Sequence, residues 1–321
     1  MGCSGLGQGS RFHLKPVQWY QVSGWQEDNL QEALPAILKS CEQAPKNMVN
    51  FCRGLNAHLK DDNQKLRAYF EKMLKPYQVV AYGSSTGKIT GYYEAELSGT
   101  LEQENGAQVP IYGLPDNYQA GKKTNTREEI ETSCAEAPVL AWANDPVELF
   151  IAQVQGSGRL TTPSGEVLHL AYAGNNGYPF TGIGTILKEE GIEGLHSMSD
   201  IRSYLQAHPQ QAIKYMRQNK RYIYFRIVQG ETPYGTAGVV LTPERSVAVD
   251  TRYIPMHTIM FLNTTKPDKT PVHKLVMAQD TGAAIKGGIR ADYFFGHGEQ
   301  AFQMAGQMNQ VGSYYLLMPK G

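Results

Sequence analysis

Short runs rich in Val, Ile, Tyr and Phe, separated by Gly, Pro and Asn, recur through the middle and C-terminal parts of this chain. Runs of this kind are typical of β-strands bounded by turns, and no other feature constrains the fold as much. They predict a mainly β protein. The predicted strands are Gln78–Tyr82, Ile89–Tyr93, Leu168–Tyr172, Arg221–Val228, Ser246–Val249, Ile259–Leu262 and Tyr314–Met318.

A smaller number of segments carry apolar side chains at helical spacing instead, which predicts helices flanking the β structure. In Asp61–Lys75 the apolar residues follow the i, i+3, i+4, i+7, i+8 pattern of one helix face, Asp61 or Asp62 is available as N-cap, and Pro76 is expected to end the helix. Further helices are predicted over Leu30–Leu38, Ser199–Ala207 and Pro209–Asn219, with Pro209 in a first turn.

The distribution of turn residues predicts two domains. From about Leu97 to Lys123 the chain is rich in turn residues, and strand-like runs lie on both sides of this stretch. The simplest organisation is therefore one β domain that is split in sequence by an inserted second domain. We expect residues 11–94 and 222–321 to form the first domain, with N-terminal helices, and residues 95–221 to form the inserted β domain.

Composition disfavours several classes of function. The 30 basic and 30 acidic side chains give no net charge, so nucleic acid is not expected as a partner. No apolar stretch approaches the roughly 18 to 20 residues of a membrane span, and the longest candidate, Leu149–Val154, has the length of a strand. Neither a metal nor a cofactor is expected, because the sequence has no HExxH or CxxC pair and Gly182-Ile183-Gly184 lacks the third glycine of a dinucleotide fingerprint.

The four cysteines are Cys3, Cys41, Cys52 and Cys134. Cys41 and Cys52 flank a short loop and could form a disulfide in an oxidising compartment, whereas in a cytosolic protein they would be buried thiols. Cys3 precedes a Gly/Ser-rich stretch, which is typical of a mature bacterial lipoprotein whose signal peptide has been replaced by Met1-Gly2. An ordinary flexible terminus is the alternative. Cys134 has no evident partner.

The most unusual segment, Ala278–Gly298, holds five glycines, two cations and two carboxylates, Asp280 and Asp292, twelve positions apart. Glycines let the backbone approach a ligand closely, and a cation can keep one carboxylate ionised. Aromatic neighbours such as Phe294 can desolvate the other carboxylate and keep it protonated near neutral pH. Such a difference in environment separates an acid from a supporting carboxylate. A solvated turn with ordinary surface charges is the alternative.

Together with three other segments, this run resembles the membrane-bound lytic murein transglycosylase A family, and the match reaches from about Phe51 to Leu317. The resemblance implies a double-psi β-barrel domain that is split in sequence, with an inserted smaller β-barrel domain and a cleft between them. The other matching segments are Thr90-Gly91-Tyr92-Tyr93-Glu94, Asp145-Pro146-Val147-Glu148-Leu149-Phe150 and Gln153-Val154-Gln155-Gly156-Ser157-Gly158-Arg159-Leu160.

The resemblance also implies an activity, the cleavage of the MurNAc-GlcNAc β-1,4 bond of peptidoglycan without water, which leaves a 1,6-anhydro-MurNAc end. Asp292 falls at the position of the single catalytic acid/base, which should have a raised pKa. Asp280, Lys286 and Glu148 fall at supporting positions. We expect Asp280 to be ionised, against Lys286 or Arg290. Substrate-binding positions are matched by Thr90, Tyr92, Gln155, Gly156, Ser157 and Gly158.

Partners and location follow from the same resemblance. It implies peptidoglycan glycan strands as the partner, with other cell-wall synthesis or hydrolysis proteins as further candidates. It implies an outer-membrane lipoprotein that faces the periplasm of a Gram-negative bacterium and is anchored by lipid on Cys3. The enzyme class is a lytic exotransglycosylase, a carbon-oxygen lyase, although nothing in the sequence separates exo from endo cleavage. The linker between Tyr118 and Thr126 is shorter than is usual in the family.

Two other functions stay open at this point. A glycan-binding cell-wall lipoprotein could have the same cleft without catalysis. An aspartic peptidase is the second alternative, because Asp280-Thr281-Gly282-Ala283 matches the DTGA signature in which two aspartates share a proton. A single chain of this length should contain two copies of that signature, and only one is present.

Overall fold

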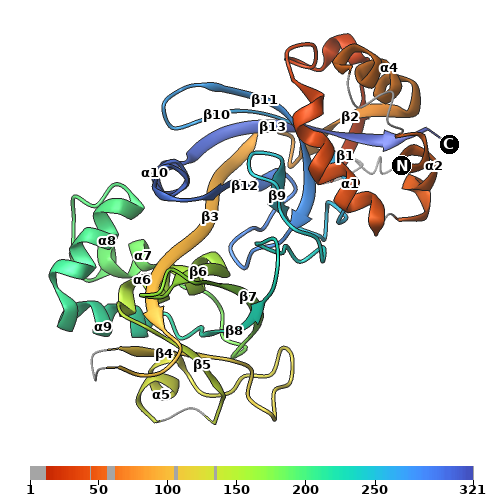
Figure 1. The fold of residues 1–321 in the computed structure, drawn as a ribbon. Coiled ribbons are helices and arrows are strands. Elements are labelled where there is room, and N and C mark those ends of the chain that lie inside the picture. Colours follow the sequence, from red (N-terminus) through yellow and green to blue (C-terminus); the bar gives the residue numbers. More distant parts are fainter. Residues whose placement is uncertain (1–11, 44, 56–61, 105–107, 134–135, 321) are drawn as a thin grey trace, which may run out of the picture. The chain divides into compact units, whose positions relative to one another are not determined.

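The computed structural model describes residues 12–43, 45–55, 62–104, 108–133 and 136–320 (Figure 1). The chain is mainly β with helices and divides into two compact units. The first unit comprises Met1–Gly91, Gly235–Phe294 and Met308–Gly321, and the second comprises Tyr92–Tyr234 and Phe295–Gln307. Two strands, β3 (Gly87–Thr100) and β12 (Arg290–His297), continue from one unit into the other.

The first unit is built around paired strands. Strand β1 pairs with β2, β2 with β13, β13 with β10 and β10 with β11, all antiparallel, while β9 pairs parallel to β11 and antiparallel to β12. Because β12 also neighbours β3, and β3 pairs with β13, six strands close a ring. The strands of the ring are β9 (Ser246–Val249), β10 (Ile259–Thr265), β11 (Pro271–Asp280), β13 (Asn309–Pro319), β3 and β12. Strands β2 (Leu74–Ala81) and β1 (Phe12–Pro16) extend the pairing from β13 outside the ring.

N-terminal helices pack on these strands. Helix α4 (Asn63–Met73) begins where predicted, because the Asp62 side chain accepts hydrogen bonds from two backbone N–H groups of its first turn. It ends at Met73, earlier than expected, since the residue before Pro76 avoids helical angles. Its buried side chains join a core that includes residues of β10 and β11. The other helices are η1 (Trp19–Gln21), η2 (Leu30–Ala33), α1 (Leu34–Glu42), η3 (Lys46–Met48) and α2 (Val49–Gly54).

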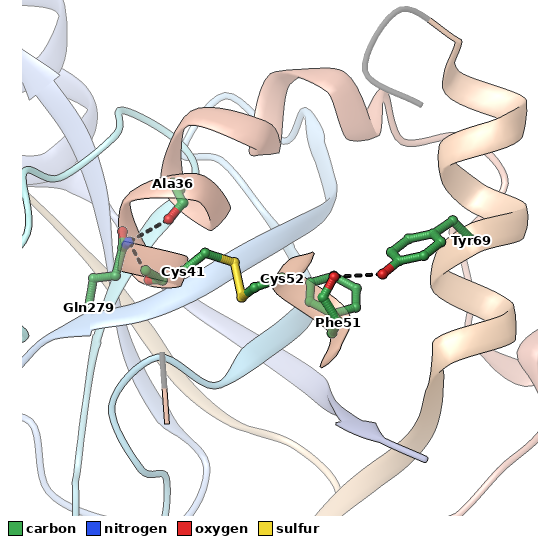
Figure 2. Close-up of a disulfide and its surroundings, with 7 residues drawn as sticks. Ala36, Cys41, Phe51, Cys52, Tyr69 and Gln279 are labelled. Carbon is green, nitrogen blue, oxygen red and sulfur yellow. Dashed lines mark hydrogen bonds between the residues drawn. A yellow bond between two sulfur atoms is a disulfide. The ribbon is translucent and has the colours of Figure 1, made fainter. Parts of the chain in front are cut away.

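A disulfide joins two of these helices (Figure 2). Cys41 in α1 and Cys52 in α2 are bonded, with their Cα atoms 5.5 Å apart. The fully buried Gln279 of β11 donates hydrogen bonds to the Ala36 carbonyl and to Ser40 Oγ of α1, both at 2.8 Å. Helix α1 is therefore fastened both to α2 and to the strand that ends at Asp280.

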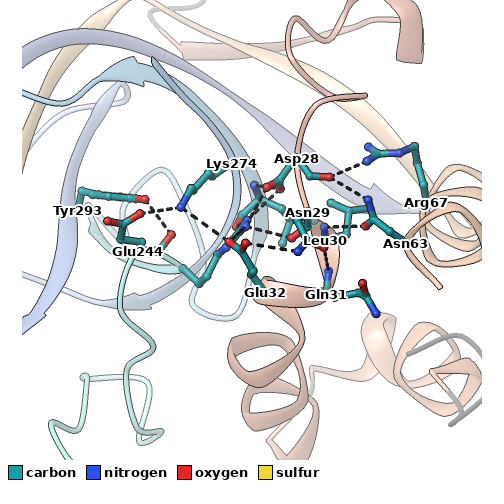
Figure 3. A network of polar contacts seen from close by, with 12 residues as sticks. Asp28, Asn29, Leu30, Gln31, Glu32, Asn63, Arg67, Glu244, Lys274 and Tyr293 are labelled. Atoms are coloured by element: carbon teal, nitrogen blue, oxygen red, sulfur yellow. Dashed lines mark hydrogen bonds and ion pairs between the residues drawn. The ribbon is translucent and has the colours of Figure 1, made fainter. Parts of the chain in front are cut away.

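A buried ionic network also fastens the N-terminal segment to the strands (Figure 3). Arg245, which precedes β9, donates to both carboxylate oxygens of Asp28, at 2.8 and 2.9 Å. Asp28 also accepts the backbone N–H of Leu275 in β11, at 2.8 Å. Asp28 and Arg245 are only 4% and 2% exposed. A bidentate pair at this depth is geometrically specific, and removal of one partner would leave a buried charge.

In the second unit, β3 pairs parallel to β6, which continues antiparallel to β7 and then β8. Strand β5 pairs with β3 and with β4. These strands are β4 (Val109–Tyr112), β5 (Val139–Ala143), β6 (Ser157–Thr161), β7 (Val167–Asn175) and β8 (Ile223–Val228). The helices are α5 (Arg127–Thr132), α6 (Pro146–Gln155), α7 (Ile183–Glu189), α8 (Met198–Ala207), α9 (Pro209–Gln218) and α10 (Glu299–Gln307).

The apolar run Leu149–Val154, which has the length of a strand, lies in helix α6. The Asp145 side chain accepts the backbone N–H of Val147 at 2.7 Å, and Pro146 occupies the first position, so the helix start is well defined. Most of its side chains are buried in the core of the second unit. A helix that is buried on nearly all sides has no amphipathic pattern, which is why the spacing of its residues did not reveal it.

Candidate active site

Asp280 and Asp292 lie in one row across three strands of the first unit. Asp292 of β12 pairs with Ala248 of β9, and Asp280 at the end of β11 pairs with the same alanine from the other side. Neighbouring strands are about 4.8 Å apart, so the two aspartate Cα atoms are about 10 Å apart. The strand pairing thus places the backbone positions of the two aspartates on either side of the same residue of β9.

The half-buried carboxyl group of Asp292 has a specific hydrogen-bond donor. The hydroxyl of Thr90, on β3, donates to Asp292 Oδ1. Thr90 Oγ1 in turn accepts a hydrogen bond from Arg290 Nη2, at 2.8 Å. Arg290 also donates from Nη1 to the Ala291 carbonyl at 2.6 Å and to the Lys88 carbonyl at 3.5 Å. The arginine therefore contacts the carboxyl group through a hydroxyl, and β3 and β12 hold its position.

Burial raises the pKa of Asp292 above its ordinary value of 3.8. The hydrogen bond from Thr90 and the charges of Arg290 and Lys88 act in the opposite direction and offset part of the rise. Phe294, two positions along β12 and therefore on the same side of the strand, is 1% exposed. The carboxyl group thus keeps its proton to a higher pH than an exposed aspartic acid would.

The neighbouring carboxylate, Asp280, accepts hydrogen bonds from backbone N–H groups. Its Oδ1 accepts the N–H groups of Thr236 and Thr281, both at 2.9 Å. Arg290, a suggested partner of Asp280, lies beside Thr90 and Asp292 instead. Lys286, the other suggested partner, has an exposed side chain on the segment between β11 and β12.

Sequence reasoning missed Asp250, which follows directly after β9 and is 3% exposed. Its Oδ2 accepts the backbone N–H of Gly287 at 2.8 Å and pairs with Arg252 Nη2 at 2.6 Å. The hydrogen bonds from Arg252 hold the pKa of Asp250 well below its usual range, so this carboxylate stays ionised. Gly287 has a φ of +126°, an angle that favours glycine. Asp250 therefore fixes the loop that leads into Arg290 and Asp292.

The remaining predicted sugar-binding residues lie in the second unit. Gln155 ends α6, and its Oε1 accepts the backbone N–H of Tyr93 at 3.2 Å. Gly156 turns the chain with a φ of +84°, and an added side chain there would meet open space. Ser157 begins β6, and Gly158 pairs with Ala95 of β3. Tyr92 precedes this part of β3 and is 8% exposed. The loop of residues 155–158 is thus held against β3.

Glu148, on α6, forms an ion pair within the second unit. Its Oε1 accepts Arg202 Nε at 2.5 Å and Gln206 Nε2 at 2.9 Å, both from α8. The Arg202 guanidinium also lies 5.0 Å from the centre of the Phe302 ring on α10. Burial raises the pKa of Glu148 above its usual value, although Arg202 opposes this shift. These contacts join α6 to α8, which is the pattern expected of structural support.

Two predicted features lie outside the described residues, namely Cys3 and Cys134. Within the described ranges, no helix is long and apolar enough to cross a membrane. Nor do the described residues include a group of three or more His, Cys, Asp or Glu side chains that could hold a metal ion.

Two family models match the chain, the MltA specific insert domain over residues 88–226 and the 3D domain over residues 245–318. The solved structure of the lytic transglycosylase LtgG of Burkholderia pseudomallei is 38% identical and covers 97% of this chain and 96% of its own, with a TM-score of 0.67. MltA from Neisseria gonorrhoeae is 30% identical over 98% of this chain and 94% of its own, with a TM-score of 0.85. The chain belongs to the MltA family.

MltA is the membrane-bound lytic murein transglycosylase A, so the resemblance of the four sequence motifs is confirmed. The curated MltA of Escherichia coli is 28% identical over 240 residues, which are 72% of this chain and 65% of that relative. A structure of E. coli MltA with bound chitohexaose has the same fold, with a TM-score of 0.75 and 23% identity over 96% of this chain and 92% of its own.

Proposed function

We propose that this protein is a lytic transglycosylase in which Asp292 is the single acid/base. Members of its family are lytic murein transglycosylases, which are peptidoglycan-cleaving lyases. The observation that carries the role of Asp292 is its environment, since burial favours the protonated carboxyl group. A general acid needs a pKa close to the working pH, and a raised pKa brings an aspartic acid toward that range.

The reaction needs only one carboxyl group. Asp292 donates its proton to the glycosidic oxygen, the bond between that oxygen and the MurNAc anomeric carbon breaks, and N-acetylglucosamine leaves as an alcohol. The C6 hydroxyl oxygen of the same MurNAc bonds to the anomeric carbon, and its proton passes to the Asp292 carboxylate. The product is a 1,6-anhydro ring and the acid is regenerated. Hydrolases that use water instead usually need a second catalytic carboxyl group.

Supporting roles are proposed for the other predicted residues. Asp280, held by backbone N–H groups in the same row as Asp292, supplies a nearby carboxylate, and Lys286 a nearby cation. Glu148 supports α6 and the loop that follows it. Sugar contacts are assigned to Thr90, Tyr92, Gln155, Gly156, Ser157 and Gly158.

The finer features of the family are carried over as part of the same proposal. The ring of six strands would form a double-psi β-barrel, with residues 11–94 and 222–321 as the catalytic domain and residues 95–221 as the insert. The MltA of E. coli is a membrane-bound murein enzyme, and one of its structures holds chitohexaose, a glycan. We therefore assign peptidoglycan glycan strands as the substrate and an outer-membrane lipoprotein, anchored through Cys3, as the form in the cell.

Digestion of purified sacculi followed by mass spectrometry tests the proposal. The wild-type protein should release muropeptides one water lighter than hydrolysis products. Asp292→Asn should lower this release by at least about 100-fold, because it removes the proton donor. An exposed control, Lys46→Met, should behave as the wild type. Release by Asp292→Asn at the wild-type rate would remove Asp292 from its role. Binding without products would favour a glycan-binding protein, and pepstatin-sensitive proteolysis would favour a peptidase.

A further inference from the structure

The hydroxyl of Thr90 lies between a group that can only donate and a group that can accept. Arg290 Nη2 is 2.8 Å from Thr90 Oγ1, and a guanidinium has no hydrogen-bond acceptor. Thr90 must therefore accept from Arg290. Its own proton has one acceptor among the described residues, Asp292 Oδ1. The positive charge of Arg290 favours the same orientation, because it attracts the Thr90 oxygen and repels the hydroxyl proton.

This orientation has a consequence for the two oxygens of Asp292. Oδ1 already accepts a hydrogen bond from the Thr90 hydroxyl, so an acid proton on Oδ1 toward Thr90 would be repelled by the hydroxyl proton. The acid proton then belongs on Oδ2. We propose that Arg290 is a positioning residue, which directs the Thr90 hydroxyl toward Asp292 Oδ1 and so assigns the acid proton of Asp292 to Oδ2. The inference rests on the proposed function, because it concerns the oxygen that donates the proton to the glycosidic bond.

The position of Arg290 fits this role. It lies two residues before Asp292 on β12, and alternate residues of a strand share a side. Two backbone carbonyls, of Lys88 and Ala291, accept its Nη1, so the guanidinium is held while Nη2 faces Thr90. During the second half of the reaction Oδ1 is still occupied by the Thr90 hydrogen bond. Oδ2 therefore both gives the first proton and accepts the second, from the C6 hydroxyl.

Without Arg290 the Thr90 hydroxyl can turn and accept a hydrogen bond from a proton on Oδ1. The acid proton of Asp292 would then be distributed over Oδ1 and Oδ2. Arg290→Met should therefore lower kcat by about 10-fold, within the range that positioned acids contribute. Arg290→Lys keeps a charged group that only donates and should restore most of the lost rate. Arg53→Met, an exposed position on α2, is the matched control and should have the wild-type kcat.

A double-mutant cycle distinguishes this role from a direct effect of the arginine charge. Thr90→Val removes the hydroxyl through which Arg290 acts, so Arg290→Met should cause no further loss of kcat in that background. The measurement is made at the pH where the rate no longer depends on pH, because there Asp292 is fully protonated and a change in its pKa has no effect. If Arg290→Met does not fold, Arg290→Gln replaces it, since its amide can turn an oxygen toward Thr90.

The outcomes distinguish the positioning role of Arg290 from the proposed function of the protein. Losses that multiply in the double variant, or an unchanged kcat in Arg290→Met, would overturn the positioning role while leaving Asp292 as the acid. A wild-type protein that releases no 1,6-anhydro product would overturn the proposed function itself. A kcat in Arg290→Lys as low as that in Arg290→Met would show that the donor-only contact is not what matters.

Discussion

Two aspartates of the same unit, the buried Asp28 and the half-buried Asp292, differ in how they contact an arginine. Asp28 contacts Arg245 directly through both oxygens and also accepts a backbone N–H (Figure 3). Asp292 meets Arg290 only through the hydroxyl of Thr90. Asp28 thus accepts hydrogen bonds from an arginine and from the backbone, whereas Asp292 has one hydroxyl donor and a raised pKa. The number of hydrogen-bond donors, more than the depth of burial, distinguishes Asp28, with its structural role, from Asp292, with its proposed chemical role.

The largest effect is expected when the structural pair is broken. Asp28→Asn would leave the buried Arg245 with the exposed Glu32 carboxylate as its remaining counter-charge, and removal of one partner of a buried pair typically costs about 3–5 kcal/mol. Urea unfolding followed by circular dichroism measures the loss. The matched variant is Asp292→Asn, which removes a carboxylate from a site with no directly bonded arginine. Equal losses of stability in both variants would remove the distinction between the two aspartates.

Asp292→Asn is expected to change the free energy of unfolding less than Asp28→Asn does, and in the opposite direction. The folded pKa of Asp292 lies above its ordinary 3.8, so the favourable contribution of the protonated group is complete below about pH 3.8 and is lost as pH rises through the folded pKa. Asparagine has no charged form and avoids this loss. We expect the variant to match the wild type near pH 3.5 and to exceed its unfolding free energy by on the order of 1 kcal/mol near pH 7.5. A variant that is less stable at every pH would contradict the raised pKa.

The reach of local sequence patterns explains which helices, strands and contacts could be predicted from the sequence. Helix α4 and its N-cap follow from residues within one short segment. The helix was predicted, with Asp61 or Asp62 as its cap, and the structure has Asp62 as the cap and an earlier end at Met73. All seven predicted strands overlap strands of the structure for the same reason, whereas β11 and β12, which carry Asp280 and Asp292, were not predicted as strands. The Thr90 contact with Asp292 joins residues 202 positions apart, and the Asp28 contact with Arg245 joins residues 217 positions apart. No spacing rule reaches that far, because strand pairing decides which residues meet.

The family motifs supplied part of what local patterns could not. They placed Asp292 and Thr90 at matching positions, and the structure brings the two side chains into contact. They did not indicate Asp250 or the direction of Arg290, since both depend on the path of the loop between β11 and β12. One available signal was overlooked. A carboxylate directly after the predicted strand Ser246–Val249 lies at a strand end, where functional loops begin.

The smallest effect concerns an exposed charge that acts on Asp292, that of Lys88. The positive charge of Lys88 lowers the pKa of Asp292, behind the larger contributions of Thr90 and Arg290. Lys88→Met should therefore raise that pKa and move the alkaline limb of the kcat/KM profile upward by a few tenths of a pH unit. Salt at 1 M should nearly abolish the difference from wild type, because exposed charges are screened. Lys46→Met is the control, with an exposed charge on η3. A shift that persists in high salt would indicate a direct structural effect of Lys88, and a downward shift would mean that a group other than Asp292 sets the limb.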